Sequence, residues 1–101
     1  MTHRIIYSIQ AEADVENLFF VIINDYKSPL TAGRYLQGIY DIIRQLETVA
    51  ASLPIQTATS FFRFGSNARR INYKKMAIIY TIHRNIVYIR RIIPASMITK
   101  L

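Results

Sequence analysis

Hydrophobic residues at the start of the chain follow first the period of a strand and then that of a helix. Ile5, Tyr7 and Ile9 alternate with other residues along the segment 4–9, a pattern typical of a β-strand. From residue 11 onward, apolar residues recur every three or four positions, so we expect a first helix over about 11–25. The chain therefore begins with a strand that leads almost directly into a helix.

Capping residues mark the start of a second helix. Ser28 can accept hydrogen bonds from free amide groups, and Pro29 suits the first helical position because its missing N–H is not needed there. Apolar residues continue along one face until the pair Leu53-Pro54 ends the helix. Because the link at 25–27 is so short, we expect the two helices to form an antiparallel hairpin.

The second half of the chain has the pattern of a small sheet. Residues 54–67 lack a clear period and contain turn formers, which indicates a connecting segment with a short strand around 61–64. Three strand-like runs follow, at 68–73, 76–82 and 86–93. The short links between these runs require antiparallel neighbours, and Pro94 ends the last strand.

The element order predicts an α+β fold of the form β-α-α-β-β-β, with the helical hairpin packed on a small twisted antiparallel sheet. With 101 residues the chain has room for one domain, which spans 1–101. The predicted core consists of Leu18, Phe19, Ile22, Leu36, Ile39, Ile43, Ile78 or Ile79, and Ile89. The pattern leaves open which face of the sheet the helices cover.

The last strand carries apolar residues on both sides. Uninterrupted alternation places Val87, Ile89, Arg91 and Ile93 on one face, and Ile86, Tyr88, Arg90 and Ile92 on the other. One face must lie under the helices. We expect the other to be an exposed apolar patch that a partner covers.

Composition excludes several classes of protein. There is no cysteine, so disulfides and thiol chemistry are excluded. The two histidines, His3 and His83, are far apart in sequence, and we expect neither a metal nor another cofactor. Apolar runs such as 18–23 are much shorter than the roughly 20 residues of a membrane-spanning helix, so we expect a cytoplasmic protein with no membrane partner.

The net charge of +7 is unevenly distributed. All six carboxylates precede residue 48, whereas residues 63–101 carry nine lysines and arginines and no acid. These cations could be solvated surface groups, but a merely soluble surface usually mixes both signs. We therefore expect an anionic partner. The residues predicted to face a target or partner are Arg69, Arg70, Tyr73, Lys74, Lys75, Tyr88, Arg90 and Arg91.

Several short segments, spread over about residues 4–98, follow one another in the order and spacing of a known protein family. They are Tyr-Ser-Ile-Gln-Ala-Glu-Ala-Asp from Tyr7, Ser-Pro-Leu-Thr-Ala-Gly-Arg-Tyr-Leu from Ser28, Arg-Ile-Asn-Tyr from Arg70, Ile-Ile-Tyr from Ile78 and Val-Tyr-Ile-Arg-Arg-Ile from Val87. Together they resemble the RelE/ParE superfamily of prokaryotic toxins. The resemblance implies the growth-inhibiting toxin of a type II toxin–antitoxin system, such as those that stabilise plasmids. An acidic antitoxin that folds on binding would neutralise it as a hetero-oligomer.

Two mechanisms occur in this superfamily. RelE-like members cut messenger RNA on the ribosome, whereas ParE-like members interfere with DNA gyrase without a nuclease centre. The resemblance places Ala77 where RelE-like enzymes have an arginine, and the tail 92–101 has no tyrosine or histidine to move a proton. The Ser-Pro-Leu-Thr-Ala start of the second helix also looks ParE-like. We therefore favour a non-enzymatic gyrase inhibitor.

Three alternatives remain open at this stage. The first is a RelE-like endoribonuclease, in which Arg70, Lys74, Lys75 and Arg91 would carry the chemistry. The second is a degenerate, inactive toxin. The third is a nucleic-acid-binding module held by phosphate contacts.

Overall fold

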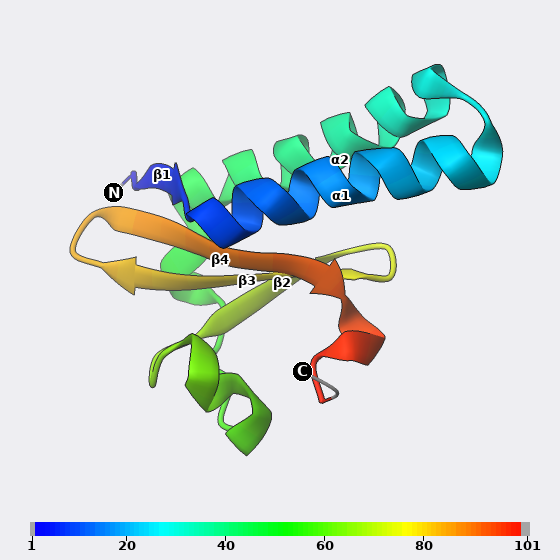
Figure 1. Cartoon of the computed structure of the whole chain (residues 1–101). Helices are drawn as coiled ribbons and strands as arrows, with labels where there is room; N and C mark the ends of the chain where they lie inside the picture. The colour runs from blue at the N-terminus through cyan, green and yellow to red at the C-terminus, as the bar shows by residue number, and fades with distance from the viewer. Residues whose placement is uncertain (1, 100–101) are drawn as a thin grey trace.

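The computed structural model describes residues 2–99 and contains a four-stranded sheet and two long helices. The strands are β1 (Arg4–Tyr7), β2 (Arg69–Tyr73), β3 (Met76–His83) and β4 (Ile86–Pro94), and the helices are α1 (Ile9–Tyr26) and α2 (Pro29–Val49). Three short 3₁₀ helices complete the fold, η1 (Ala50–Ser52), η2 (Thr59–Phe64) and η3 (Ala95–Met97). The helical hairpin lies across one face of the sheet (Figure 1). Hereafter the opposite face is called the outer face.

The sheet has the strand order β1-β4-β3-β2. The predicted antiparallel meander of β2, β3 and β4 is confirmed, but β1 pairs parallel with β4, so the sheet is mixed. The path of the helices explains this. The Glu47 carbonyl near the end of α2 accepts from the His3 amide, so the chain returns to the start of β1 before β2 begins. Two hairpin reversals then make β4 run parallel to β1.

Both helices start at serine caps. Ser28 accepts from the Thr31 amide and Pro29 is the first residue of α2, as the sequence predicts. The first boundary differs from the prediction, because Ser8 leaves the strand and caps α1 by accepting from the Ala11 amide. The predicted strand residue Ile9 therefore begins α1. Within residues 2–99, no helix is long and apolar enough to cross a membrane.

The main core fills the space between the helices and the sheet. It combines apolar residues of α2 with those of the two central strands, namely Ile39, Ile43, Leu46, Ile78, Tyr80, Val87 and Ile89. All the predicted core residues are at least partly buried, with Leu18, Phe19 and Leu36 half-buried. Both Ile78 and Ile79 are fully buried, because each faces a different side of β3.

A second, smaller core covers part of the outer face. Its buried members are Phe61, Ala68, Ala77, Ile79, Ile93 and Ile98. The prediction of a strand around 61–64 is wrong, because this segment lies in η2, whose Phe61 packs on the sheet. The Arg63 guanidinium donates to the Ile98 carbonyl and so joins η2 to the tail. The chain itself thus covers the apolar patch that was expected to receive a partner.

A β-bulge in β4 changes which side chains share a face. Ile79 pairs with Arg91, but the next residue Tyr80 pairs with Ile89, so Arg90 is left without a pairing position. As a result, Ile89 and Ile92 both belong to the main core, whereas Ile93 belongs to the outer core. The predicted uninterrupted alternation along this strand is therefore wrong from the bulge onward, where Ile92 and Ile93 have exchanged faces.

Candidate functional site

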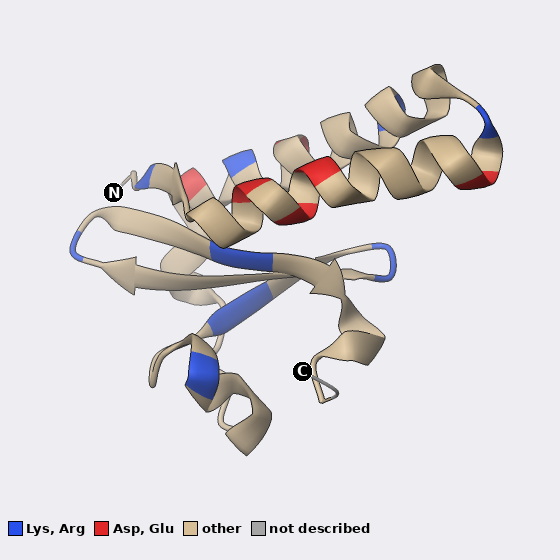
Figure 2. Ribbon diagram, viewed as in Figure 1, with Lys and Arg blue, Asp and Glu red and all other residues tan. Residues whose placement is uncertain are grey.

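The acidic side chains all lie in the helical layer, whereas most of the C-terminal cations lie on the sheet and the segments around it. Figure 2 shows the acidic residues on the two helices and a concentration of lysines and arginines on β2, β4, η2 and the strand turns. The six acids are Glu12, Asp14, Glu16, Asp25, Asp41 and Glu47, all within α1 or α2. Of the C-terminal cations, Lys100 lies outside the described residues. The sheet side of the molecule is therefore strongly cationic.

Arg91 pairs with an acid of the helical layer. Its Nε lies 2.8 Å from Asp14 Oδ2 and its Nη2 lies 3.1 Å from Oδ1. The same carboxylate accepts from the Ile92 amide at 2.9 Å. This bond to Asp14 raises the pKa of Arg91. The pairing of β1 with β4 ends at Ile89, so the Ile92 amide has no partner in β1 and donates to the Asp14 carboxylate instead.

Arg90 points to the outer face, where Thr81 and Tyr88 hold it. Its Nε donates to Thr81 Oγ1 at 2.9 Å, and the guanidinium lies 5.0 Å from the centre of the Tyr88 ring. These three residues help to line a pocket of about 380 Å³ together with Asn67, Ile82 and His83. This pocket is called the outer pocket below. The sequence pattern placed Tyr88 and Arg90 on one face, and the structure adds His83 to the same pocket.

Arg69 and Arg70 project from opposite faces of β2. On the helix side, Arg69 Nη1 donates to the Ala51 and Leu53 carbonyls at 2.8 and 2.6 Å. It thereby binds carbonyls just beyond the C-terminus of α2, where a cation is favourable. On the outer face, Arg70 Nη2 donates to Asn72 Oδ1 at 2.9 Å.

Lys74 and Lys75 form the two-residue turn between β2 and β3. The Lys74 ammonium lies 5.3 Å from the centre of the Tyr35 ring and 5.5 Å from that of Tyr73. These two rings make an edge-to-face pair with centroids 5.2 Å apart. Tyr73 therefore lies on the helix side of the sheet, whereas Tyr88 lies on the outer face. Lys75 is exposed.

The eight residues predicted to bind a target or partner thus occupy separate places. Arg70, Tyr88 and Arg90 share the outer face. Arg69, Tyr73 and Lys74 contact residues of the helical layer or of the segment that follows it. Arg91 lies at the open edge of β4. Lys75 lies exposed in the turn between β2 and β3. The structure therefore distributes the eight residues over both faces of the sheet, its open edge and one turn.

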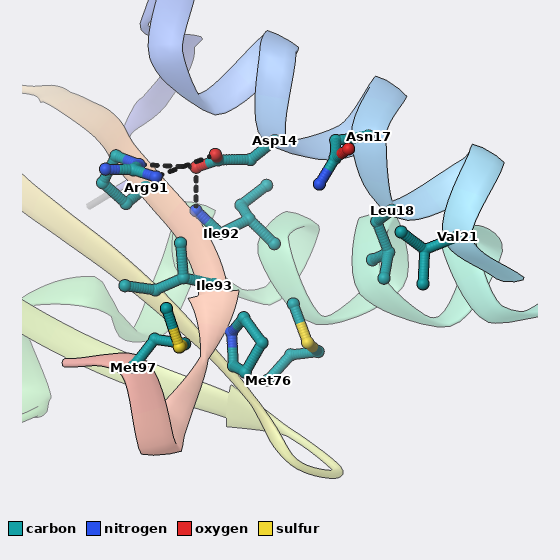
Figure 3. A pocket seen from close by; sticks show the side chains of 10 residues that line it. Asp14, Asn17, Leu18, Val21, Met76, Arg91, Ile92, Ile93 and Met97 are labelled. Atoms are coloured by element: carbon teal, nitrogen blue, oxygen red, sulfur yellow. Dashed lines mark hydrogen bonds and ion pairs between the residues drawn. The ribbon is translucent and has the colours of Figure 1, made fainter. Parts of the chain in front are cut away.

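A mainly apolar groove of about 340 Å³ runs along the open edge of β4 (Figure 3). On one side, Leu18 and Val21 of α1 line it. Met76, Met97 and the end of β4 line the other. The Asp14–Arg91 pair lies at one end of this edge groove. Sequence reasoning missed the groove, because its lining comes from four elements that only the tertiary fold brings together.

The described residues offer little for metal chemistry. Within residues 2–99, no group of three or more histidines, cysteines or acids lies close enough to hold a metal ion. The C-terminal tail within this range, including the buried Ile98, presents no histidine or tyrosine.

The sequence matches no known protein family and no curated protein. The structure is similar to a solved chain from the chromosomal ParDE TA system of P. aeruginosa, with a TM-score of 0.76. The two chains are 15% identical, and the similarity covers 92% of this chain and 96% of that one. This similarity shows the fold. The predicted α+β fold, with the element order β-α-α-β-β-β and a helical hairpin on a sheet, is therefore confirmed.

Proposed function

We propose that this chain is the toxin of a type II toxin–antitoxin pair, that a cognate acidic antitoxin neutralises it, and that it interferes with DNA gyrase. The observation that carries the proposal is the fold, which is similar over 92% of the chain to a protein of a ParDE TA system. The cationic sheet side supports it further, because nine cations and no acid in residues 63–101 require an external anionic partner.

The surroundings of Ala77 favour gyrase over messenger RNA as the target. Ala77 occupies the position where the resemblance places an arginine in RelE-like nucleases. It is fully buried in the outer core beside Ile79 and Ile93, so an arginine there would displace η2 or the tail. The centre of the outer face is closed in this chain, which argues against a substrate lying across it.

The other nuclease candidates do not gather around one phosphate. Arg70 bonds Asn72 on the outer face, while Lys74 lies over the Tyr35 ring near the helices. Arg91 is bound to Asp14 at the edge of β4, so its charge is already neutralised. Electrostatic stabilisation of a cleavage transition state needs several donors aimed at the same oxygen atoms. The dispersed arrangement supports the non-enzymatic alternative.

The edge groove offers the antitoxin a place to dock. Its apolar lining includes Met76 and Met97, and the flexible methionine side chain adapts well to a partner. Lys75, in the turn just before Met76, adds an exposed positive charge. An amphipathic, acidic segment of the antitoxin would place its apolar residues in the groove and its carboxylates near these cations.

The target is tested by adding the purified chain to gyrase and relaxed plasmid, and in parallel to a bacterial translation extract. We expect supercoiling to stop at a stoichiometric excess of the chain while ribosome-bound transcripts stay intact. Unimpaired supercoiling at that excess would contradict gyrase as the target. Transcripts cut at defined positions would replace the proposal with the RelE-like alternative.

Two turn lysines provide a matched comparison for the role of the cationic side. Lys74 and Lys27 both have a positive φ, of 53° and 55°, so a glutamine at either position meets the same backbone constraint. Lys74 lies in the turn between β2 and β3, whereas Lys27 lies in the link between α1 and α2. We expect Lys74→Gln to weaken binding of the antitoxin and Lys27→Gln to leave it unchanged. Equal effects would mean that net charge alone drives binding.

A further inference from the structure

We propose that the outer pocket binds the phosphate group of a single-stranded nucleic acid through the Arg90 guanidinium. Phosphate esters and free phosphate share this chemistry, and the experiment below distinguishes them. The inference goes beyond the proposed function, which assigns no nucleic-acid site to this chain. Its test measures binding on the isolated chain, without gyrase, antitoxin or growth, so the two proposals can fail independently.

The guanidinium group of Arg90 is positioned by its neighbours in an orientation that can bind an anion. Arg90 shares the outer face with Tyr88, its Nε donates to the Thr81 hydroxyl, and its guanidinium lies over the Tyr88 ring. Among residues 2–99, the two terminal nitrogens of Arg90 have no hydrogen-bond partner. Their planar arrangement matches two phosphate oxygens at once. Because the guanidinium is already positioned, binding loses less side-chain entropy.

Among residues 2–99, no acidic side chain pairs with Arg90. The pocket lining contains no aspartate or glutamate, and every acid of the sequence lies before residue 48, in the helical layer. By contrast, Arg91 has Asp14 and Arg69 has two carbonyl partners. Arg90 is thus a rigid outward-facing cation with two unused donor nitrogens, and an external oxyanion is its natural partner.

The rest of the lining suits a nucleotide. The Asn67 side chain donates to the Ile82 carbonyl at 3.2 Å, which fixes the amide and leaves its oxygen available to a ligand. His83 and Tyr88 add groups that can both donate and accept hydrogen bonds. Such mixed groups complement the sugar and base edges that accompany a phosphate. A volume of about 380 Å³ lies within the range of about 300–1,000 Å³ typical of small-molecule sites.

An acidic peptide fits this place less well than a nucleotide. Around the pocket β4 is paired with both β3 and β1, whereas β2 pairs with β3 only as far as Tyr80. On the short stretch of β3 beyond Tyr80, the Ile82 carbonyl already accepts from the Asn67 side chain, which leaves little open edge for an extended peptide. Five of the six lining residues are polar or aromatic, which leaves an amphipathic helix without an apolar anchor. The observations therefore favour a nucleic acid.

The test measures fluorescence anisotropy of a labelled single-stranded oligonucleotide as the full chain is added. The informative variant is Arg90→Gln. Its control is Arg84→Gln, because Arg84 is exposed at the nearby β3–β4 turn, lies outside the pocket lining and carries the same charge. Thr81→Val keeps the shape of the side chain and removes the hydroxyl that positions Arg90. Thermal unfolding of each variant shows whether it is folded.

We expect Arg90→Gln to raise the dissociation constant about tenfold or more, because a charge-assisted pair of hydrogen bonds is lost. Thr81→Val should raise it about threefold, as expected for a positioning residue, and Arg84→Gln should raise it less than twofold. Inorganic phosphate should displace the oligonucleotide only at a much higher concentration, because it makes no sugar or base contacts.

Three results would overturn the inference. The first is an equal loss of affinity in the Arg84→Gln and Arg90→Gln variants, which would indicate general electrostatic attraction. The second is inorganic phosphate that binds as tightly as the oligonucleotide, which would identify a free-phosphate site. The third is no binding at low salt by the folded parent chain.

Discussion

Asp14 shows how one side chain completes a sheet edge that the backbone leaves open. Its carboxylate accepts two hydrogen bonds from Arg91 and one from the Ile92 amide, at the point where β1 no longer accompanies β4. The pair is largely buried, with 15% of the Asp14 side chain and 25% of the Arg91 side chain exposed. Removing the charge of Asp14 leaves a partly buried cation without a counter-ion, and an amide at this position offers one acceptor oxygen to three donor groups.

Asp14→Asn should therefore lower the free energy of unfolding by about 1–3 kcal/mol. The control is Asp41→Asn, because the exposed Asp41 accepts only from Gln37 on its own helix, and its loss should cost less than about 0.5 kcal/mol. Urea unfolding of the three proteins measures both values. Equal losses at the two positions would show that Asp14 does not stabilise the edge of β4.

The buried hydroxyl of Tyr80 should make the folded protein less stable at alkaline pH. Its hydroxyl donates to the Ala50 carbonyl at 2.8 Å, and burial raises the pKa of Tyr80 from 10.0 to about 12. The folded state therefore holds this proton more tightly than the unfolded state does. Its contribution is complete below pH 10 and is lost as the pH rises toward 12, by up to about 1.4 kcal/mol per pH unit.

Unfolding measured between pH 8 and about pH 11 tests this expectation. Tyr80→Phe cannot ionise, so its stability should decline less steeply than that of the parent, although Tyr7, whose pKa burial also raises to about 12, still contributes. The exposed Tyr26 serves as the control, and Tyr26→Phe should follow the parent. If the stability of Tyr80→Phe fell with pH as steeply as that of the parent, ionisation of Tyr80 would not be the cause of the alkaline loss.

At the scale of elements, the two glycines of α2 differ in what surrounds them. A Cβ built at Gly33 meets nothing within 4 Å, whereas one built at Gly38 would overlap the Tyr73 hydroxyl oxygen. Gly38 thus allows α2 to approach β2 closely enough for Tyr35 and Tyr73 to make their edge-to-face contact. Gly33 has no such role.

Gly33→Ala should raise the free energy of unfolding by about 0.5–1 kcal/mol, because alanine favours the helix. Gly38→Ala should lower it despite the same helical gain, because the Tyr73 ring must move away from Tyr35. Thermal unfolding gives both signs. If Gly38→Ala stabilised the protein as much as Gly33→Ala, α2 and β2 could not be so close.

The elements also show what sequence patterns can and cannot predict. Helices and strands with a regular period, such as α2 and β3, were predicted to within a few residues because their burial is one-sided or continuous. The 3₁₀ helix η2 was not, since Phe61 is buried by contact with distant Ala77 and Ile93 and not by any local period. The bulge at Arg90 and its pairing with Thr81 likewise depend on the register between two strands.

At the scale of the whole molecule, charge follows the layers of the fold. The acids lie on the helices and the C-terminal cations on the sheet side, a separation that counting along the sequence predicted (Figure 2). The Asp14–Arg91 contact across the layers was not predictable, because 77 positions separate the two residues. Nor could the sequence alone indicate that η2 and the tail close the centre of the outer face.

The most direct test of the account is the growth of bacterial cells after induced expression of this chain. We expect growth to stop when the chain accumulates alone, and to continue when the protein encoded by the adjacent gene is expressed with it. Unimpaired growth of cells that contain the soluble, folded chain without any antitoxin would contradict the assignment as a toxin.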